Sequence, residues 1–257
     1  MTVSLVISSY NWKEALRLCL LSVTRQTVLP FEVIIADDGS TDGTKEVVDS
    51  FQRHSPFPIK YVWHEDQGWR KCVILNKAFA LCQGDYVIEI DGDIILHSCF
   101  IQDHLSEALP GYYLLGSRAK MNENLSNKLL RSGNYHLSLF TRGIKRKINI
   151  LRLPWLTPSF CNHNSERGCN VSFWRKDILN VNGYDESFVG YGYEDIDLFA
   201  RLSRNGVKRR FVKFKAIEYH VFHQGTPLDR LDANRYIYDN NNQDQIIKCT
   251  RGLCQYL

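Results

Sequence analysis

Two carboxylates separated by one glycine, Asp91 and Asp93, have the spacing most suggestive of chemistry in this sequence. They follow the apolar run 86–90, which is typical of a buried strand, so both can turn toward one point at the end of that strand. Mg²⁺ and Mn²⁺ are commonly held by one or two carboxylates together with substrate phosphates. The pattern indicates a metal site, and the alternative is an ordinary Asp-Gly turn with solvated charges.

A second acidic pair, Asp37-Asp38, follows the apolar run 31–36 and leads into Ser40 and Thr41. An aspartate at a strand end can accept hydrogen bonds from a base or a ribose, whereas Ser40 or Thr41 can cap the helix expected from about residue 42 to 51. These residues alone leave both interpretations open. The sequence has neither G-x-x-x-x-G-K-[ST] nor G-x-G-x-x-G after its first strand, which argues against a P-loop enzyme and a dinucleotide-binding dehydrogenase.

Glycines alternate with tyrosines in the segment 190–197, which ends in three acids. Aromatic rings beside carboxylates suit a sugar, because its C–H faces stack on rings and its hydroxyls bond to acids. A carboxylate at a helix start is a candidate general base. The alternative is that these acids only complement the positive end of the helix dipole.

His220 and His223 lie three residues apart near the end of this region. Imidazole nitrogens can complete a metal site built on aspartate. The alternative is a chance spacing without a ligand.

Strand and helix patterns alternate through the first half of the chain. Strands are expected at 3–8, 31–36, 59–63 and 86–90, and helices at 12–24, 42–51 and 71–82. This alternation predicts an α/β fold with a mostly parallel central sheet flanked by helices, in which ligands bind beyond the carboxyl ends of the strands. The acidic pairs follow such ends.

The second half of the chain is less regular. Strands are expected at 112–116 and 207–217, a helix at 196–204, and a loop-rich or partly helical insertion at about 122–164. Because no repeat and no linker interrupts the sequence, we expect one domain over residues 1–257.

The composition is that of an ordinary globular protein. Of 257 residues, 44% are hydrophobic and 23% are charged, which excludes intrinsic disorder, collagen and coiled coil as whole-chain structures. No apolar run approaches the ~20 residues of a membrane span. The first ten residues lack the basic start of a signal peptide, so a cytoplasmic protein is expected. The eight cysteines are scattered, which favours reduced, mostly buried thiols.

Positive charge is concentrated in residues 124–165, which contain seven Lys and Arg residues and no Asp or Glu. Basic and apolar residues without acids suit an anionic membrane, so Lys145, Arg146 and Lys147 are expected to contact the inner face of the plasma membrane peripherally. The alternatives are a solvated basic face and a wall that binds an acidic polysaccharide. A net charge of +4 is too small to indicate nucleic-acid binding, and no nucleic-acid partner is expected.

Several motifs, taken in order, resemble family 2 glycosyltransferases of the GT-A fold. They are VISSYN (6–11), IIADDGSTDGT (34–44), and GDY (84–86) leading into DGD (91–93). Later segments are similar to the C-terminal half of β-1,4-galactosyltransferases and chondroitin-polymerase-type enzymes, namely RGCN (167–170), NGYDESF (182–188) and GYGYEDID (190–197). The resemblance covers about residues 3–225. It implies a single GT-A (Rossmann-like) domain with a nucleotide-binding half (1–95), an acceptor-binding half (96–225) and a C-terminal tail (226–257).

The resemblance also implies roles for individual residues. Asp38 matches the acid that binds uracil or ribose, and Asp91 lies near the ribose or the metal. The segment 66–70 resembles a donor-site segment, so the implied donor contacts are Ser9, Tyr10, Asp38, Asp66, Arg70, Asp91 and Asp93. Mn²⁺ or Mg²⁺ is implied on Asp93 and His223, with His220 as a further ligand. Asp195 matches the general base and Glu194 its acceptor-binding neighbour, and further acceptor contacts are implied for Asn170, Tyr191, Gly192 and Tyr193.

We therefore expect an inverting, metal-dependent hexosyltransferase. It would move a sugar from a UDP-sugar to a glycan or lipid-linked glycan acceptor, in polysaccharide or glycolipid assembly. One alternative is a sugar nucleotidyltransferase, but residues 8–13 contain one cation and no glycine where such an enzyme needs a triphosphate loop. The other is a non-catalytic module that binds a nucleotide-sugar or a glycan, against which Asp93, Asp195 and His223 argue.

Overall fold

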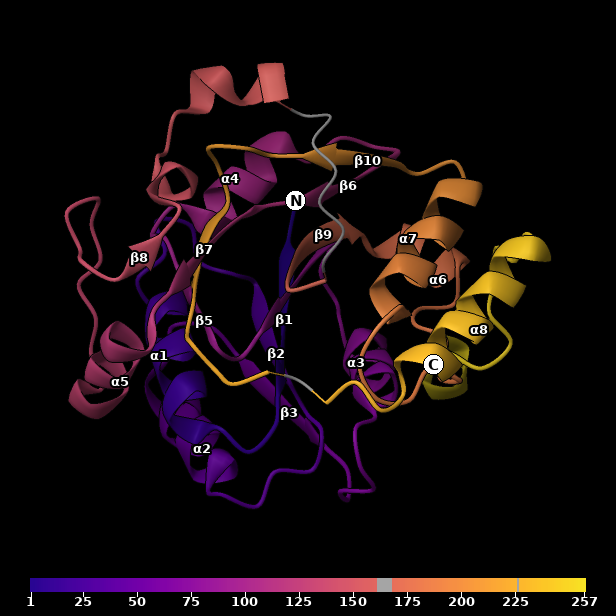
Figure 1. The fold of residues 1–257 in the computed structure, drawn as a ribbon, viewed down its shortest axis with the longest axis horizontal. Helices are drawn as coiled ribbons and strands as arrows, with labels where there is room; N and C mark the ends of the chain where they lie inside the picture. The colour runs from indigo at the N-terminus through magenta and orange to yellow at the C-terminus, as the bar shows by residue number, and fades with distance from the viewer. Residues whose placement is uncertain (161–167, 226) are drawn as a thin grey trace.

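The computed structural model describes residues 1–160, 168–225 and 227–257, and its main element is a seven-stranded sheet (Figure 1). The strands are β1 (Val3–Ser9), β2 (Glu32–Asp37), β3 (Ile59–Trp63), β4 (Tyr86–Asp91), β6 (Tyr112–Leu115), β9 (Asn170–Trp174) and β10 (Lys208–Phe211). Their order is β10-β6-β9-β4-β1-β2-β3, in which only β9 runs antiparallel to its neighbours. The expected α/β fold with a mostly parallel sheet is confirmed.

Helices cover both faces of this sheet. One face carries α1 (Lys13–Val23), α2 (Thr44–His54) and α4 (Phe100–Glu107), and the other carries α3 (Lys71–Ala80), α6 (Arg175–Asn180) and α7 (Glu194–Arg204) (Figure 1). Successive residues of β1 serve the two cores, because Val6 packs in one while Leu5 and Ile7 pack in the other. Burial on both faces explains why these strands have nearly continuous apolar sequences.

A second, four-stranded sheet lies beside the first. It has the order β5-β11-β7-β8, with β5 (Ile94–Leu96), β7 (Ser117–Met121), β8 (Ile144–Lys145) and β11 (Ile217–His220). Its apolar core includes Ile95, Ala119 and Tyr219, and also Leu129 from α5 (Glu123–Ser132). This sheet matters for the site because β11 ends at His220.

Two expectations about the second half of the chain need correction. The strand expected at 207–217 is two strands in different sheets, β10 and β11. Phe214 and Ala216 between them have positive φ angles of 65° and 47°, which end an extended conformation. Among the described residues, six α-helices and β-strands lie where none was expected, namely β5, α4, β7, β9, α6 and α8 (Leu231–Gln243). Helix α8 is predominantly polar, so it has little apolar periodicity to detect.

The start of α2 also differs from the expectation. Neither Ser40 nor Thr41 caps the helix, because Gly43 at φ 96° turns the chain immediately before it. The carboxylate of Asp42 accepts the backbone N–H of Thr44 at 3.0 Å instead.

The insertion expected at 122–164 is partly helical over the residues described. It contains α5, β8 and the 3-10 turns η1 (Lys147–Ile150) and η2 (Pro154–Phe160). The chain ends in a further 3-10 turn, η3 (Leu253–Tyr256). The seven described cysteines are free thiols, and Cys161 lies outside the described residues. Among the helices described, none combines the length and the hydropathy that crossing a membrane requires.

Candidate functional site

A cavity of about 1000 Å³ opens at the carboxyl ends of β1 and β4. Most of the residues singled out by the sequence line it, namely Ser9, Tyr10, Asp38, Asp91, Asp93, Tyr191, Gly192, Tyr193, Glu194, Asp195, His220 and His223. Asp66, Arg70 and Asn170 are not among its lining residues. The fold thus brings residues from both halves of the chain to one cavity.

Asp38 lines the part of the cavity that is expected to bind the nucleotide. Its carboxylate lies 2.6 Å from His64 Nε2 and accepts the backbone N–H of Arg70 at 2.9 Å. Burial raises the pKa of Asp38, although His64 and Arg70 oppose that effect. Tyr10 donates its hydroxyl to Asp66 at 2.8 Å. Asp66 and Arg70 therefore support lining residues rather than line the cavity themselves.

Asp91 has a partner that the sequence did not reveal. Lys71, at the start of α3, donates to Asp91 at 2.6 Å, and Ser8 donates to the same oxygen at 2.8 Å. Burial opposes the ionisation of Asp91, but the Lys71 ammonium outweighs it and holds the pKa of Asp91 below its ordinary value. Asp91 is thus an anion paired with a cation of this chain. Nothing in the local pattern separates Lys71 from an ordinary exposed lysine of a helix start.

Asp93, His220 and His223 form a group that fits a metal ion. One potential ligand atom from each lies within 4.8 Å of the others, and Asp93 Oδ2 is 3.4 Å from His220 Nε2 and 3.7 Å from His223 Nε2. Asp93 Oδ1 is buried and has no hydrogen-bond partner among the described residues. Burial and the neighbouring Asp91 raise the pKa of Asp93 to about 7.

Backbone contacts hold the three groups together. The N–H of Val221 donates to the carbonyl of Asp93 at 2.9 Å, which ties the end of β11 to the turn after β4. The N–H of Gly92 donates to Ser8 at 2.7 Å, and a side chain at Gly92 would meet the Ser8 carbonyl at 2.8 Å. Burial and the Arg118 guanidinium lower the pKa of His220 to about 3, so its ring is neutral, which is the form that binds metals.

Glu194 and Asp195 open helix α7 on the other side of the cavity. Asp195 accepts the backbone N–H of Gly168 at 2.8 Å and the hydroxyl of Tyr184 at 3.1 Å. A side chain at Gly168 would collide with the Asp195 carboxylate, so glycine is required there. Glu194 Oε2 is buried without a hydrogen-bond partner among the described residues, and burial together with Asp195 raises the pKa of Glu194 to about 7.

Aromatic rings stand beside these acids. Trp69 and Tyr191 meet edge to face with their ring centroids 6.1 Å apart, and the N–H of Gly190 donates to the Trp69 carbonyl at 3.1 Å. Both rings line the cavity. Asn170 is different, because its side chain is buried between His104 and the carbonyl of Ala216. Arg167 of the same motif lies outside the described residues.

In addition to Lys71, other cations line the wall of the cavity that the four-stranded sheet forms. They are Arg118 and Lys120 on β7 and Lys145 on β8. Of these, the sequence had singled out Lys145 alone, as a membrane contact. Alternation along β7 places Arg118 and Lys120 on one side, but it could not tell which side faces a cavity.

Comparison with sequence families agrees with the expectation for both halves of the chain. The sequence model of glycosyl transferase family 2 matches residues 4–165. A second model, described as the N-terminal domain of galactosyltransferase, matches residues 157–224.

Among curated proteins, the chain is similar to the chondroitin synthase of Escherichia coli. The two are 28% identical over 238 residues, which cover 85% of this chain and 34% of that protein. The chain spans about a third to a half of the length of the first curated relatives that it matches.

Solved structures share the fold. Residues 1–349 of Staphylococcus aureus TarS, in complex with UDP, align with a TM-score of 0.67 and 16% identity, covering 100% of this chain and 68% of that one. The mannosyltransferase PcManGT from Pyrobaculum calidifontis, in complex with GDP-Man and Mn²⁺, aligns with a TM-score of 0.59 and 17% identity, covering 86% and 57%. The expected GT-A architecture is confirmed.

Proposed function

This chain belongs to glycosyl transferase family 2, and from that premise we propose that it transfers a sugar from a UDP-sugar to an acceptor hydroxyl, with inversion at the anomeric carbon. The observation that carries the proposal is one cavity lined both by the Asp93–His220–His223 group and by the helix-start acid Asp195. The first suits a diphosphate and its metal ion, and the second suits an acceptor that must lose a proton.

The donor would bind on the β1 and β2 side of the cavity. Tyr10 and Asp38 line it there, and Asp38 is fixed by His64 and by the backbone of Arg70. A related fold binds UDP in the TarS fragment, which supports a uridine donor for this chain. The cavity is also large enough for a ligand of this size.

Mn²⁺ or Mg²⁺ would be held by Asp93, His223 and His220. The unpartnered, buried Asp93 Oδ1 fits this role, because a buried carboxylate oxygen without a hydrogen bond is costly unless a ligand satisfies it. One oxygen and two imidazole nitrogens suit Mn²⁺ better than Mg²⁺, which prefers oxygen alone. When bound, the ion stabilises the negative charge that develops on the leaving diphosphate. The manganese named for the PcManGT complex supports this choice.

Asp195 would act as the general base. As the acceptor oxygen attacks, its proton passes to the Asp195 carboxylate, a bond forms between that oxygen and the anomeric carbon, and the bond from this carbon to the diphosphate oxygen breaks. UDP leaves with the electron pair. A single displacement of this kind inverts the configuration and requires no covalent intermediate. The rings of Trp69 and Tyr191 would orient the sugar or the acceptor by stacking.

The decisive experiment is a UDP-release screen with UDP-glucose, UDP-galactose, UDP-GlcNAc, UDP-GalNAc and UDP-glucuronate in the presence of Mn²⁺. We expect release with one of these donors, its loss on chelation, and a fall of roughly 10²-fold or more in the Asp195→Asn variant. Full activity in excess EDTA would contradict the metal role. Pyrophosphate formed from UTP and a sugar 1-phosphate would indicate a nucleotidyltransferase, and nucleotide binding without turnover would indicate a binding module.

We also propose that residues 1–257 form one transferase domain. The large sheet takes β1–β4 from the first half of the chain and β6, β9 and β10 from the second, so neither half has a complete sheet. The segment 226–257, expected as a tail, contains α8, and Arg204 of α7 donates to the Ile246 carbonyl at 2.8 Å. The described part of this segment, residues 227–257, therefore belongs to the same packed unit.

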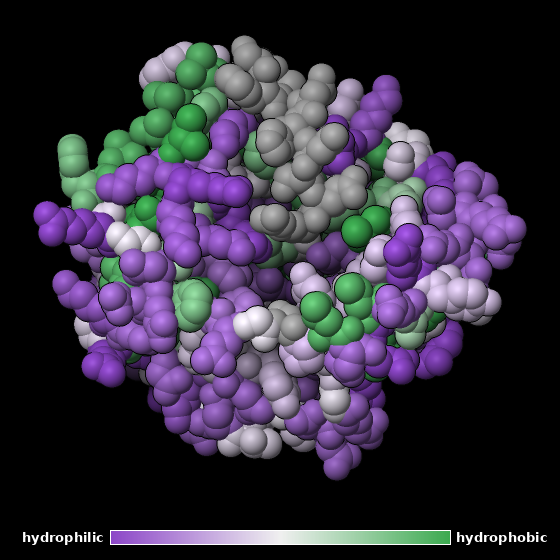
Figure 2. Space-filling model, in the orientation of Figure 1, coloured by the Kyte–Doolittle hydropathy of each residue, from purple (hydrophilic) through white to green (hydrophobic). Residues whose placement is uncertain are grey.

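A specific surface supports a membrane-associated acceptor. The basic apolar face consists of Leu139, Phe140, Arg146, Lys147, Ile148 and Trp155, all of them exposed. Phe140 is 89% and Trp155 73% exposed, which is unusual for rings of this size. Figure 2 shows hydrophobic side chains at the upper left, over the region of η2, next to hydrophilic ones.

Hydrogen bonds connect the parts of this face. Lys147 donates to the Leu139 carbonyl at 2.9 Å. Lys213 donates to Asn149 of η1 at 2.6 Å and accepts the Thr157 hydroxyl of η2 on its carbonyl at 2.8 Å. Exposed rings beside cations fit the interface of an anionic membrane, where each cation contributes about 1 kcal/mol. We propose that this face rests on such a membrane, next to a lipid-linked or glycan acceptor.

Sedimentation with liposomes tests this contact. The protein is expected to bind anionic but not neutral liposomes at low salt, and to lose most of that binding in the Arg146→Ala/Lys147→Ala variant and in Trp155→Ala. Lys145 is left unchanged because it also lines the cavity. The matched control is Arg53→Ala/Lys176→Ala, which removes two exposed cations elsewhere. A wild-type protein that ignores anionic liposomes at low salt would exclude the contact.

A further inference from the structure

Tyr184 lies between two carboxylates, the fully buried Glu89 and the partly buried Asp195, and of the two only Asp195 lines the cavity. Its hydroxyl is 3.0 and 3.1 Å from the two oxygens of Glu89 and 3.1 Å from Oδ1 of Asp195. Tyr184 and Glu89 are fully buried. A phenol has one proton to donate, so it cannot donate to both acids at once.

The protonation state of Glu89 decides which of the two acids accepts the hydrogen bond from the Tyr184 hydroxyl. Glu89 lies in the middle of β4, and burial raises the pKa of Glu89 well above its ordinary range in spite of the Lys71 ammonium. A protonated Glu89 donates to the Tyr184 oxygen, which turns the phenolic hydrogen toward Asp195. An ionised Glu89 would instead take that hydrogen and leave Asp195 with the Gly168 N–H alone.

Tyr184 is held in place from two sides. The side chain of Asn76 on α3 accepts the Tyr184 backbone N–H at 2.9 Å and donates to its carbonyl at 2.8 Å. The ring stacks on Phe79 with the centroids 6.0 Å apart and an interplanar angle of 11°. The hydroxyl therefore has little freedom to leave its position between the carboxylates.

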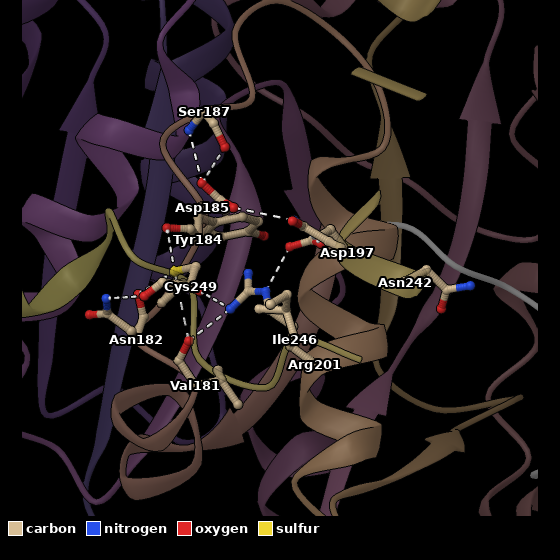
Figure 3. Close-up of polar contacts among 12 residues, drawn as sticks. Val181, Asn182, Tyr184, Asp185, Ser187, Asp197, Arg201, Asn242, Ile246 and Cys249 are labelled. Carbon is tan, nitrogen blue, oxygen red and sulfur yellow. Dashed lines mark hydrogen bonds and ion pairs between the residues drawn. The ribbon is translucent and has the colours of Figure 1, made fainter. Parts of the chain in front are cut away.

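The loop that carries Tyr184 is tied to the helix that carries Asp195. Arg201 of α7 donates to the carbonyls of Val181 and Gly183, both at 2.8 Å, and is paired with Asp197 at 2.6 Å (Figure 3). Arg201 is fully buried. Loop and helix form one frame, so the distance between Tyr184 and Asp195 is set by the fold.

From this geometry we propose that Glu89 and Tyr184 are positioning residues for the base: Glu89 donates to Tyr184, and Tyr184 donates to Asp195, which fixes the carboxylate and favours its ionised form. The proposal rests on the proposed function of Asp195. Neither residue touches substrate, because both are buried beneath the cavity wall rather than part of it.

Tyr184→Phe is the main test, since it removes one oxygen and keeps the stacked ring. Other groups that face Asp195 are Glu194 beside it on α7, Lys71 and Cys72 on α3, and Glu89 on β4, and all of them stay in place. A carboxylate that loses a hydrogen-bond donor is less favoured in its ionised form, so the acidic limb of the kcat/KM profile is expected to move to higher pH, by about one unit. We expect kcat to fall about 10-fold with an unchanged KM for the donor.

Variants of Glu89 separate its proton from its volume. Glu89→Gln keeps a donor toward Tyr184 and should retain most of the activity, whereas Glu89→Leu should resemble Tyr184→Phe. The matched control is Tyr86→Phe, which removes another fully buried tyrosine hydroxyl, bonded to Ser172 at 2.8 Å on the far side of β4. Its kinetics and pH profile should equal those of the wild type.

A readout independent of turnover keeps the two proposals apart. The Asp195 carboxyl is titrated by ¹³C NMR, with Asp195→Asn to assign its signal, in the wild type and in Tyr184→Phe. A raised pKa in the variant supports the inference even if no donor is turned over, in which case only the proposed function fails. An Asp195 pKa and a pH profile that do not move in Tyr184→Phe would overturn the inference, as would a Glu89→Gln variant as impaired as Glu89→Leu.

Discussion

Glu194 and Asp197 lie in the same turn of α7 and are both buried, yet their surroundings are opposite. Asp197 is paired with Arg201 at 2.6 Å and accepts Asn241 of α8 at 2.9 Å. One oxygen of Glu194 has no hydrogen-bond partner among the residues described, and Glu194 is one of the residues that line the cavity. One acid is satisfied by the protein, and the other is left for a ligand.

The same contrast separates Asp91 from Asp93. Asp91 is paired with Lys71 at 2.6 Å, whereas one oxygen of Asp93 has no partner among the described residues and the other lies 3.4 and 3.7 Å from two histidine nitrogens. A buried polar atom without a partner costs about 1–3 kcal/mol. The difference indicates that the paired acids stabilise the structure around the site, and that the unpaired acids are the ones available to bind a ligand.

Removing the cation from one of the paired acids should have the largest effect on the free energy of unfolding. Arg201→Met leaves Asp197 buried without its cation, which typically costs 3–5 kcal/mol. Urea unfolding is expected to show a loss of about that size. The matched control is Arg235→Met in the exposed pair with Asp239, at 3.7 Å and with the same i,i+4 spacing, where the loss should stay below about 0.5 kcal/mol. Equal losses in the two variants would abolish the distinction.

Substituting one of the unpaired acids should lower activity without destabilising the fold. Asp93→Asn is expected to lower turnover by about 10²-fold, since it weakens the hold on the metal ion, and to leave the thermal midpoint unchanged or higher. Added Mn²⁺ should stabilise the wild type and not the variant. Asp91→Asn gives the comparison, because it leaves Lys71 without its anion and should lower the midpoint. A variant of Asp93 that unfolds earlier but keeps its turnover would reverse the assignment.

Much of the fold could be predicted from the sequence because the first half has buried strands and amphipathic helices in regular alternation. Regions without that periodicity were missed. Strand β9 runs antiparallel between β4 and β6, so it depends on pairing across long sequence separations. Helix α8 is mostly polar, and it is held by partners such as Asp197 that no local pattern reveals.

The residues of the candidate site were predicted one by one from motifs. Which of its acids pair with a cation and which line the cavity was not predicted. Glu194, Asp195 and Asp197 are three acids at one helix start, and their spacing alone does not say which one meets Arg201 and which ones face a cavity. Tyr184 and Glu89 were not singled out for the same reason. In the sequence each has the pattern of a buried core residue, and only the fold brings the two within 3.0 Å of each other. Motifs identify the acids, and packing assigns their partners.

The smallest effect that sharpens the comparison is a pH dependence of stability. Burial and Asp195 raise the pKa of Glu194 to about 7 in the folded chain, above its ordinary value of 4.5. Between these two values the folded state keeps a proton that the unfolded state has lost, so this carboxyl makes the protein less stable as the pH rises from 4.5 to 7. Glu194→Gln removes that dependence. From pH 5 to pH 8, the wild type should lose about 2 kcal/mol more unfolding free energy than the variant. Urea titrations at both pH values measure this, with Glu14→Gln, an exposed glutamate of α1, as the control for the chemical change. If Glu194→Gln and the wild type respond equally to pH, Glu194 has a partner in solution and belongs with Asp197 rather than with Asp93.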